Sequence, residues 1–192
     1  MTEFSDPQHA TRRDVIVQTA VALQAVGCIA ALWPIIAQMN PHQGSPAPEM
    51  REVDLPAIEP GETKTVAWRG LPIAIRHRTS AQVHLSRSVA VSELSDRLAR
   101  NDALGKDARA TDANRTKAGH EEWLVVISIC THLGCRLQTT RAAGMSASND
   151  GWVCSCHAAR FDLSGRVRSG PPRTNLTVPR YEFVTPKRIR IG

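Results

Sequence analysis

The chain has 192 residues, a formal net charge of +6 and a hydrophobic share of 42%. This length is sufficient for one well-buried domain and an appendage. The positive charge would suit a nucleic-acid partner, but only 4% of the residues are aromatic and no RNA- or DNA-binding motif is present. We therefore expect scattered surface charge and no nucleic acid among the partners.

The first element in the chain is a long apolar run. No charged residue occurs between Val15 and Met39, and a helix over these positions would be roughly 37 Å long, enough to cross the hydrocarbon core of a bilayer. Pro34 lies near the outer end, where a kink is tolerated, and we expect Cys28 to be a buried small hydrophobe. The pattern predicts a single transmembrane anchor over residues 15–39, with a buried helix of a soluble core as the alternative.

Two arginines precede this run. Arg12 and Arg13 flank it on one side, whereas the next Lys or Arg on the other side is Arg51. This asymmetry places residues 1–14 in the cytoplasm. The pair also resembles a twin-arginine export signal, which carries folded, cofactor-loaded domains across a membrane. Since no A-x-A-like cleavage site comes after the run, we predict an uncleaved anchor and a periplasmic location for the remainder of the chain.

Residues 40–50 form the next segment. They include three prolines and a glycine, and residues 40–48 contain no Val, Ile, Leu or Phe. Such a stretch packs poorly and stays semi-extended. It is predicted to be a linker, which serves either as a plain spacer or as a hinge for the domain beyond it.

The remainder, residues 51–192, is predicted to be mostly β. Short segments of alternating apolar and polar residues are separated by Pro- and Gly-containing turns, as expected for an all-β sandwich or a barrel-like domain. The predicted strands lie within residues 51–58, 63–69, 71–78, 122–129, 181–184 and 188–191, with a hairpin turn at Ser164 and Gly165.

Two stretches differ from this pattern. Val91, Leu94 and Leu98 recur at helical spacing with charges between them, which predicts a short surface helix over residues 89–100. Residues 101–120 are polar, and Leu104 is their only large aliphatic residue. We expect this second stretch to be a solvated surface loop.

Two short boxes carry the chemistry. Each has two cysteines and one histidine: C-T-H-L-G-C at residues 130–135 and C-S-C-H at residues 154–157. Strand-like residues precede both boxes, which gives a rigid mounting. Thiolate sulfur and neutral imidazole are soft and borderline metal ligands, so one Cys and one His from each box would make a four-ligand set. A structural zinc site is the alternative, although neither box has the usual zinc-finger spacing.

The boxes resemble those of the Rieske iron–sulfur proteins, C-x-H-x-x-C and C-x-C-H, at all six positions. The resemblance implies one 2Fe–2S cluster with two Cys on one iron and two His on the other. It also implies an antiparallel β domain with a small cluster-binding subdomain, here at about residues 125–175, and a disulfide that suits an oxidising compartment. The implied ligands are Cys130, His132, Cys154 and His157, and the implied disulfide joins Cys135 and Cys156.

Other features extend the resemblance to the Rieske subunits of cytochrome bc complexes. Those subunits share the twin-arginine anchor, a tether that acts as a hinge, and a proline loop packed over the cluster, here Gly170, Pro171 and Pro172. The resemblance implies an electron-transfer subunit of a quinol–cytochrome c oxidoreductase in a bacterial inner membrane. Its partners would be cytochrome b, a c-type cytochrome and a quinol, within a dimeric complex.

Three residues of the boxes have further implied roles. A histidine bound to iron keeps its second ring nitrogen free, so His132 and His157 are candidates to hydrogen-bond a quinol and accept its proton. Leu133 lies between the ligands of the first box. It either shields the cluster from water or only fills the loop.

The second box departs from the family pattern, which reads Cys-Pro-Cys-His-Gly-Ser, a variable residue, Tyr and Asp. This chain has Ala159 in place of the Ser and Phe161 in place of the Tyr. Hydrogen bonds from these two hydroxyls favour the reduced, more negative cluster, so their loss predicts a lower midpoint potential. Arg160, a neighbouring cation, would offset part of this shift.

Three other classes of protein compete with this interpretation. The small subunit of arsenite oxidase is also a Rieske protein with a twin-arginine leader, but it binds no quinol. Ferredoxin-like Rieske modules of oxygenases are soluble and lack the disulfide pair, and a structural zinc protein would carry no iron. The span, the tether and the proline loop favour the bc complex.

Overall fold

The computed structural model describes residues 11–39, 50–140 and 150–192. The chain divides into two compact units, Met1–Ser45 and Pro46–Gly192. Apart from Met50, the predicted hinge at residues 40–50 lies outside the described residues.

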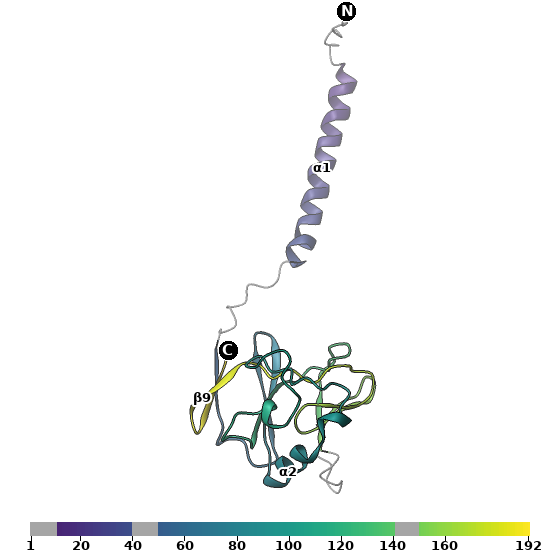
Figure 1. The fold of residues 1–192 in the computed structure, drawn as a ribbon. Coiled ribbons are helices and arrows are strands. Elements are labelled where there is room, and N and C mark those ends of the chain that lie inside the picture. The colour runs from purple at the N-terminus through teal and green to yellow at the C-terminus, as the bar shows by residue number, and fades with distance from the viewer. Residues whose placement is uncertain (1–10, 40–49, 141–149) are drawn as a thin grey trace, which may run out of the picture. The chain divides into compact units, whose positions relative to one another are not determined.

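The first unit contains one helix. α1 spans Arg12–Met39 and contains Pro34 without ending there (Figure 1). Its length and composition are those of a helix that can cross a membrane, as predicted. Cys28 is exposed on this helix, so its predicted burial within the protein is wrong. Like Cys28, every described side chain of α1 is exposed.

The described residues of the second unit form three antiparallel sheets, which confirms the mostly-β prediction. Each strand pairs with a neighbour through an antiparallel ladder. The first sheet has the order β1 (Arg51–Asp54), β10 (Arg188–Ile191), β9 (Tyr181–Thr185); the second β2 (Thr63–Trp68), β3 (Leu71–His77), β4 (Trp123–Ile127); the third β5 (Gln138–Thr140), β6 (Gly151–Cys154), β7 (Ala159–Phe161), β8 (Val167–Ser169).

The paired strands β3 and β4 are mostly buried. Ile73 faces Ile127 and Ile75 faces Val125 in this ladder, and the side chains of Ile73, Ile75 and Val125 are fully buried. Each such burial contributes about 1.5–3 kcal/mol to stability, and β-branched side chains suit a pleated surface. The first box therefore comes shortly after a buried strand of the core.

The helix predicted over residues 89–100 is wrong. The helix is α2, Ser80–Ser88, and only a 3-10 turn, η1 at Val91–Glu93, comes after it. A capping box starts α2: the Thr79 hydroxyl accepts from the Gln82 amide at 3.3 Å, and the Gln82 side chain accepts from the Thr79 amide at 3.0 Å. Beyond residue 94 the chain is irregular because its polar groups bond to distant segments.

The solvated loop predicted over residues 101–120 is only partly correct. Asp102 to Asp107 is exposed, but Ala110, Asp112, Arg115 and Thr116 are buried. Arg115 lies in a 3-10 turn, η2 at Ala113–Arg115, and donates to the carbonyls of Ser164 at 2.6 Å and Leu176 at 2.8 Å. A guanidinium offers five N–H donors, so a single arginine can satisfy several buried carbonyl groups. Because Arg115 makes these hydrogen bonds in the interior, part of this polar segment is buried.

Candidate metal centre

The first box is a tight loop beyond the end of β4. The amide of Cys130 donates to the carbonyl of Cys135 at 2.8 Å, and the amide of Gly134 donates to the carbonyl of Cys130 at 3.0 Å. Gly134 has φ +79°, a conformation that glycine adopts without steric cost. The loop thus brings its two cysteines together and leaves His132 and Leu133 exposed at its tip.

The second box connects β6 to β7. Cys154 ends β6 and pairs with Ala159 at the start of β7, so residues 155–158 form the connecting loop. Ala158 in this loop has φ +53°, where the family pattern has glycine. His157 is exposed, and Cys154 is buried.

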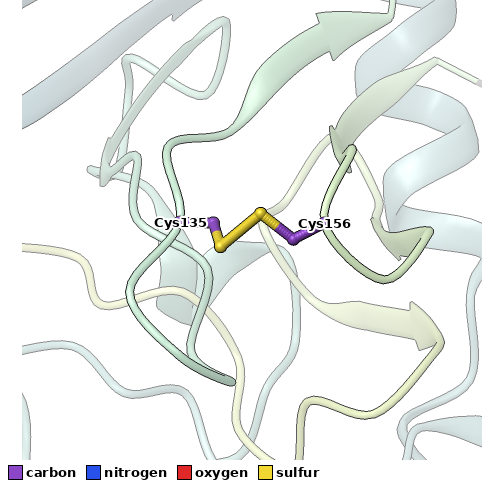
Figure 2. The surroundings of a disulfide bond; sticks show 2 residues. All are labelled: Cys135 and Cys156. Atoms are coloured by element: carbon purple, nitrogen blue, oxygen red, sulfur yellow. A yellow bond between two sulfur atoms is a disulfide. The ribbon is translucent and has the colours of Figure 1, made fainter.

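A disulfide joins the two loops. Cys135 and Cys156 are bonded, with their Cα atoms 6.9 Å apart (Figure 2). This confirms the predicted pairing, and the bond restricts how far the two loops can separate. The Sγ atoms of Cys154, Cys135 and Cys156 all lie within 4.8 Å of one another. Because disulfide sulfurs are not thiolates, Cys154 is the one cysteine of these three whose sulfur is available to bind a metal.

The structure arranges the four predicted ligands in two pairs, one buried and one exposed. Cys130 and Cys154 are 2% and 1% exposed, whereas the exposed rings of His132 and His157 meet edge to face with centroids 4.9 Å apart. Burial raises the pKa of Cys130, and the neighbouring Cys154 thiol raises it further, although a backbone hydrogen bond from His132 opposes this. Two adjacent buried thiols become thiolates readily only beside a cation, so this donor set fits a metal centre.

The loop around the predicted prolines packs against the boxes. The Thr131 hydroxyl donates to the carbonyl of Thr174 at 2.6 Å. A Cβ atom on Gly170 would lie 2.7 Å from Cα of Ala159, which means that the two backbones are in close contact. Pro172 is buried and Pro171 is exposed. The loop therefore contacts both the first box and the strand after the second.

The remaining predicted residues differ in exposure. Ala159 is 0% and Phe161 is 2% exposed, so both face the interior of the cluster-binding region. Arg160 points outward between them. Leu133 exposes 70% of its surface, and it forms an apolar tip beside His132.

Sequence reasoning missed the polar network behind the second box. Asp112 accepts from Arg78 at 2.6 Å and from the Ser164 hydroxyl at 2.5 Å. Arg166 donates to Asp162 at 2.8 Å and is itself 0% exposed. The turn signal at Ser164 and Gly165 was visible in the sequence, but its partner Asp112 lies about fifty residues away, and no local pattern connects them.

Comparison with known proteins identifies the class of this site. Residues 87–182 match the family model described as "Rieske [2Fe-2S] domain". Residues 2–42 match the model described as "Ubiquitinol-cytochrome C reductase Fe-S subunit TAT signal", which includes Arg12 and Arg13. The chain is therefore a Rieske protein, and its cofactor is a 2Fe–2S cluster.

Relatives that match along nearly the whole chain show which family of Rieske proteins this is. Three proteins named "Ubiquinol-cytochrome c reductase iron-sulfur subunit" are similar to this chain. The one from Bradyrhizobium diazoefficiens is 44% identical over 193 residues, covering 100% of both chains. Those from Rickettsia felis and Cereibacter sphaeroides are 43% and 42% identical, covering 100% and 95% of this chain and 98% and 95% of their own lengths. The chain belongs to the iron–sulfur subunits of ubiquinol–cytochrome c reductase, an oxidoreductase complex of the membrane.

Proposed function

We propose that this chain takes one electron from a quinol at the outer membrane face and passes it to a c-type cytochrome. The observation that carries the proposal is the paired arrangement of the site, in which two buried thiols lie behind two exposed imidazoles. The names of the relatives supply the quinol and the cytochrome.

The cysteines and the histidines of the site would have different roles. Cys130, Cys154, His132 and His157 would hold the 2Fe–2S cluster, which when bound supplies a one-electron redox centre. The burial of the two cysteines excludes water from that side of the site. The exposed imidazole of His132 or His157 would hydrogen-bond the quinol hydroxyl and hold the proton that leaves with the electron.

The remaining organisation of the chain would serve this role. In our proposal residues 1–14 lie in the cytoplasm, residues 15–39 form the anchor, residues 40–50 act as the hinge, and residues 51–192 form a periplasmic head with its cluster-binding subdomain at about 125–175. Arg12 and Arg13 next to an uncharged run of the helix support this orientation.

We also propose that the midpoint potential is low for the family. Ala159 and Phe161 face the interior next to the second box but carry no hydroxyl group. The cluster would thus lack two hydrogen bonds that favour its reduced form. Arg160 offsets part of this effect through its positive charge.

The test is purification of the full chain from its native membrane in mild detergent. We expect cytochromes b and c to co-purify, and reduction by added quinol to produce the electron paramagnetic resonance signal of a His-ligated 2Fe–2S cluster. Co-purification with a molybdenum protein and no response to quinol would overturn the proposal in favour of an arsenite-oxidase subunit. Dimerisation is read from the mass of the same complex.

A further inference from the structure

The charged residues of the cluster-binding region are almost all of one sign. Residues 128–176 contain six arginines and two aspartates, and no Lys or Glu. Both aspartates are half-buried and already engaged. Asp162 accepts from Arg166 at 2.8 Å, and Asp150 accepts from Gln82 at 2.9 Å. The carboxylates of this region are therefore not free to neutralise its exposed arginines.

Four of these arginines form what we call the arginine collar. All four are exposed, and none makes a side-chain hydrogen bond or an ion pair with another described residue. The arginine collar consists of Arg136, Arg160, Arg168 and Arg173.

Two residues of the collar, Arg136 and Arg173, are next in the chain to residues that bond within or to the boxes. Arg136 comes directly after Cys135, whose disulfide reaches the loop of the second box. Arg173 precedes Thr174, whose carbonyl accepts from Thr131 between two predicted ligands. Arg160 and Arg168 come from β7 and β8, which are paired neighbours. Both line one cavity of about 470 Å³, whose described lining includes Asp150 and Asp162 and no residue of either box.

Elsewhere in the second unit, carboxylates are plentiful beside surface arginines. Arg188 binds Asp54 at 2.8 Å, and Arg190 binds Glu52 at 2.9 Å and Glu182 at 3.2 Å. Twelve of the fourteen Asp and Glu residues in 51–192 lie outside residues 128–176. The carboxylates that could pair with surface cations are thus concentrated away from the cluster-binding region.

This distribution resembles half of a protein interface. Interfaces combine an apolar centre with a polar rim. Here Leu133 and the two imidazoles are exposed, and Arg136 and Arg173 lie in the segments that adjoin the first box. The guanidinium fork matches a carboxylate in two parallel hydrogen bonds. Unpaired charges of one sign also steer a partner of the opposite sign. Quinol is neutral and offers the collar no carboxylate.

We propose that the arginine collar docks the head onto a carboxylate-rich face of the cytochrome that receives the electron. The inference rests on the proposed function, because it requires such an acceptor. Salt should weaken this docking, since exposed charges are screened within a Debye length of about 8 Å at physiological ionic strength.

The experiment uses the complete complex in its native membrane. The variant is Arg136→Gln with Arg173→Gln, and the matched control is Lys64→Gln with Lys187→Gln, two exposed cations outside the cluster-binding region. The cluster is reduced, and its oxidation by the c-type haem is followed by rapid mixing at about 20 mM and about 200 mM salt. We expect the wild-type and control rates to fall with salt, and the collar variant to be about 3- to 10-fold slower at low salt and nearly independent of salt.

The direction of the effect separates docking from redox tuning. Removing cations lowers the midpoint potential, which makes the reduced cluster a stronger donor and would speed its oxidation. A slower rate therefore reports weaker docking, and Arg136→Lys with Arg173→Lys should restore part of it.

Three outcomes would overturn the inference. The collar variant could retain the wild-type rate and salt dependence, or it could be slowed only in the quinol step. The salt dependence could also vanish when the complex is placed in vesicles of neutral lipid and return with anionic lipid, which would assign the collar to the membrane surface. A wild-type complex that passes no electron to the haem would instead contradict the proposed function, and so the two failures are distinguishable.

Discussion

Ala159 and Phe161 are the two single-residue departures from the family pattern to which our proposal assigns a chemical consequence. Both side chains are buried within β7, directly after the second box. A hydroxyl at either position would point into the same interior, where a hydrogen bond to the cluster or its sulfur ligands strengthens with reduction. In our proposal the potential of this protein is set in part by the hydroxyl groups that these two side chains lack.

Restoring the hydroxyls tests this idea. Ala159→Ser combined with Phe161→Tyr should raise the midpoint by roughly 40 mV per hydroxyl, which corresponds to about 1 kcal/mol per hydrogen bond for a one-electron couple. Redox titration of the full-length complex, monitored by electron paramagnetic resonance, measures it. Ala67→Ser with Phe183→Tyr makes the same chemical changes on other strands and should leave the midpoint unchanged. An equal midpoint in both double variants would rule out the low-potential explanation.

A second residue-scale effect concerns backbone strain at Ala158. This residue has φ +53°, where an L side chain is disfavoured by about 1 kcal/mol. Ala158→Gly should raise the free energy of unfolding by about 0.5–1 kcal/mol, measured by urea denaturation of the full chain. Ala159→Gly is the control, because glycine within a strand should be destabilising. A loss of stability in Ala158→Gly would show that this loop position is not strained.

At the scale of elements, the position of the proline loop depends on Gly170, which has no side chain. Gly170 has φ +98°, and a Cβ atom there would come within 2.7 Å of Ala159 Cα. The contact is with backbone, which cannot rotate away as a flexible side chain would. Together with the Thr131–Thr174 hydrogen bond at 2.6 Å, this close approach holds the loop against the cluster-binding sheet.

Gly170→Ala should therefore displace the loop. We expect a loss of about 1–3 kcal/mol of stability from overpacking and an altered electron paramagnetic resonance line shape. Gly119→Ala is the matched control, since Gly119 has a positive φ of +79° but no atom within 4 Å of its Cβ position. Equal losses in the two variants would attribute the effect to backbone strain alone.

At the scale of the whole second unit, buried charges connect segments that are far apart in the sequence. Asp112 binds Arg78 at 2.6 Å, and both side chains are almost fully buried. Removing one partner of a buried pair leaves the other charge uncompensated, which typically costs about 3–5 kcal/mol.

Asp112→Asn should accordingly lower the free energy of unfolding by about 3 kcal/mol in a urea titration. Asp54→Asn breaks the exposed pair with Arg188 and should change stability by less than about 1 kcal/mol. If the two variants lose equal stability, the buried network does not hold the domain together.

At the same scale, Asp96 makes the stability of the second unit depend on pH. Burial alone would raise its pKa, but hydrogen bonds from Arg100 and from the amides of Asn175 and Leu98 lower the pKa of Asp96 below its ordinary 3.8. A depressed carboxyl pKa stabilises the fold fully above the unfolded value, and this contribution is lost as pH falls through the folded value.

We therefore expect stability to decline below about pH 4 in the wild type, and Asp96→Asn to be less stable at neutral pH with a shallower acid decline. Thermal unfolding of the full chain between neutral and acidic pH measures both. A decline of the same steepness in the variant would assign the acid sensitivity to another group.

Much of this protein was determined by the sequence alone. The helix of membrane-spanning length, the disulfide between the two boxes and the alternating strands were all predicted. Each of these features depends on residues adjacent in the chain or on a motif with fixed spacing. The short helix of the second unit was predicted at the wrong place, although its start signal is also local. Thr79 and Gln82 form the capping box that begins α2, whereas Val91, Leu94 and Leu98 have helical spacing but do not form an α-helix.

Tertiary structure decided the remainder. It placed Arg115 in the interior, paired Asp112 with Arg78, brought the proline loop against Ala159 and left the arginine collar without counter-ions among the described residues. These outcomes depend on which carbonyls and carboxylates from distant segments come within hydrogen-bonding distance. A buried polar group must find such partners wherever the fold supplies them, and no local spacing in the chain records where they are.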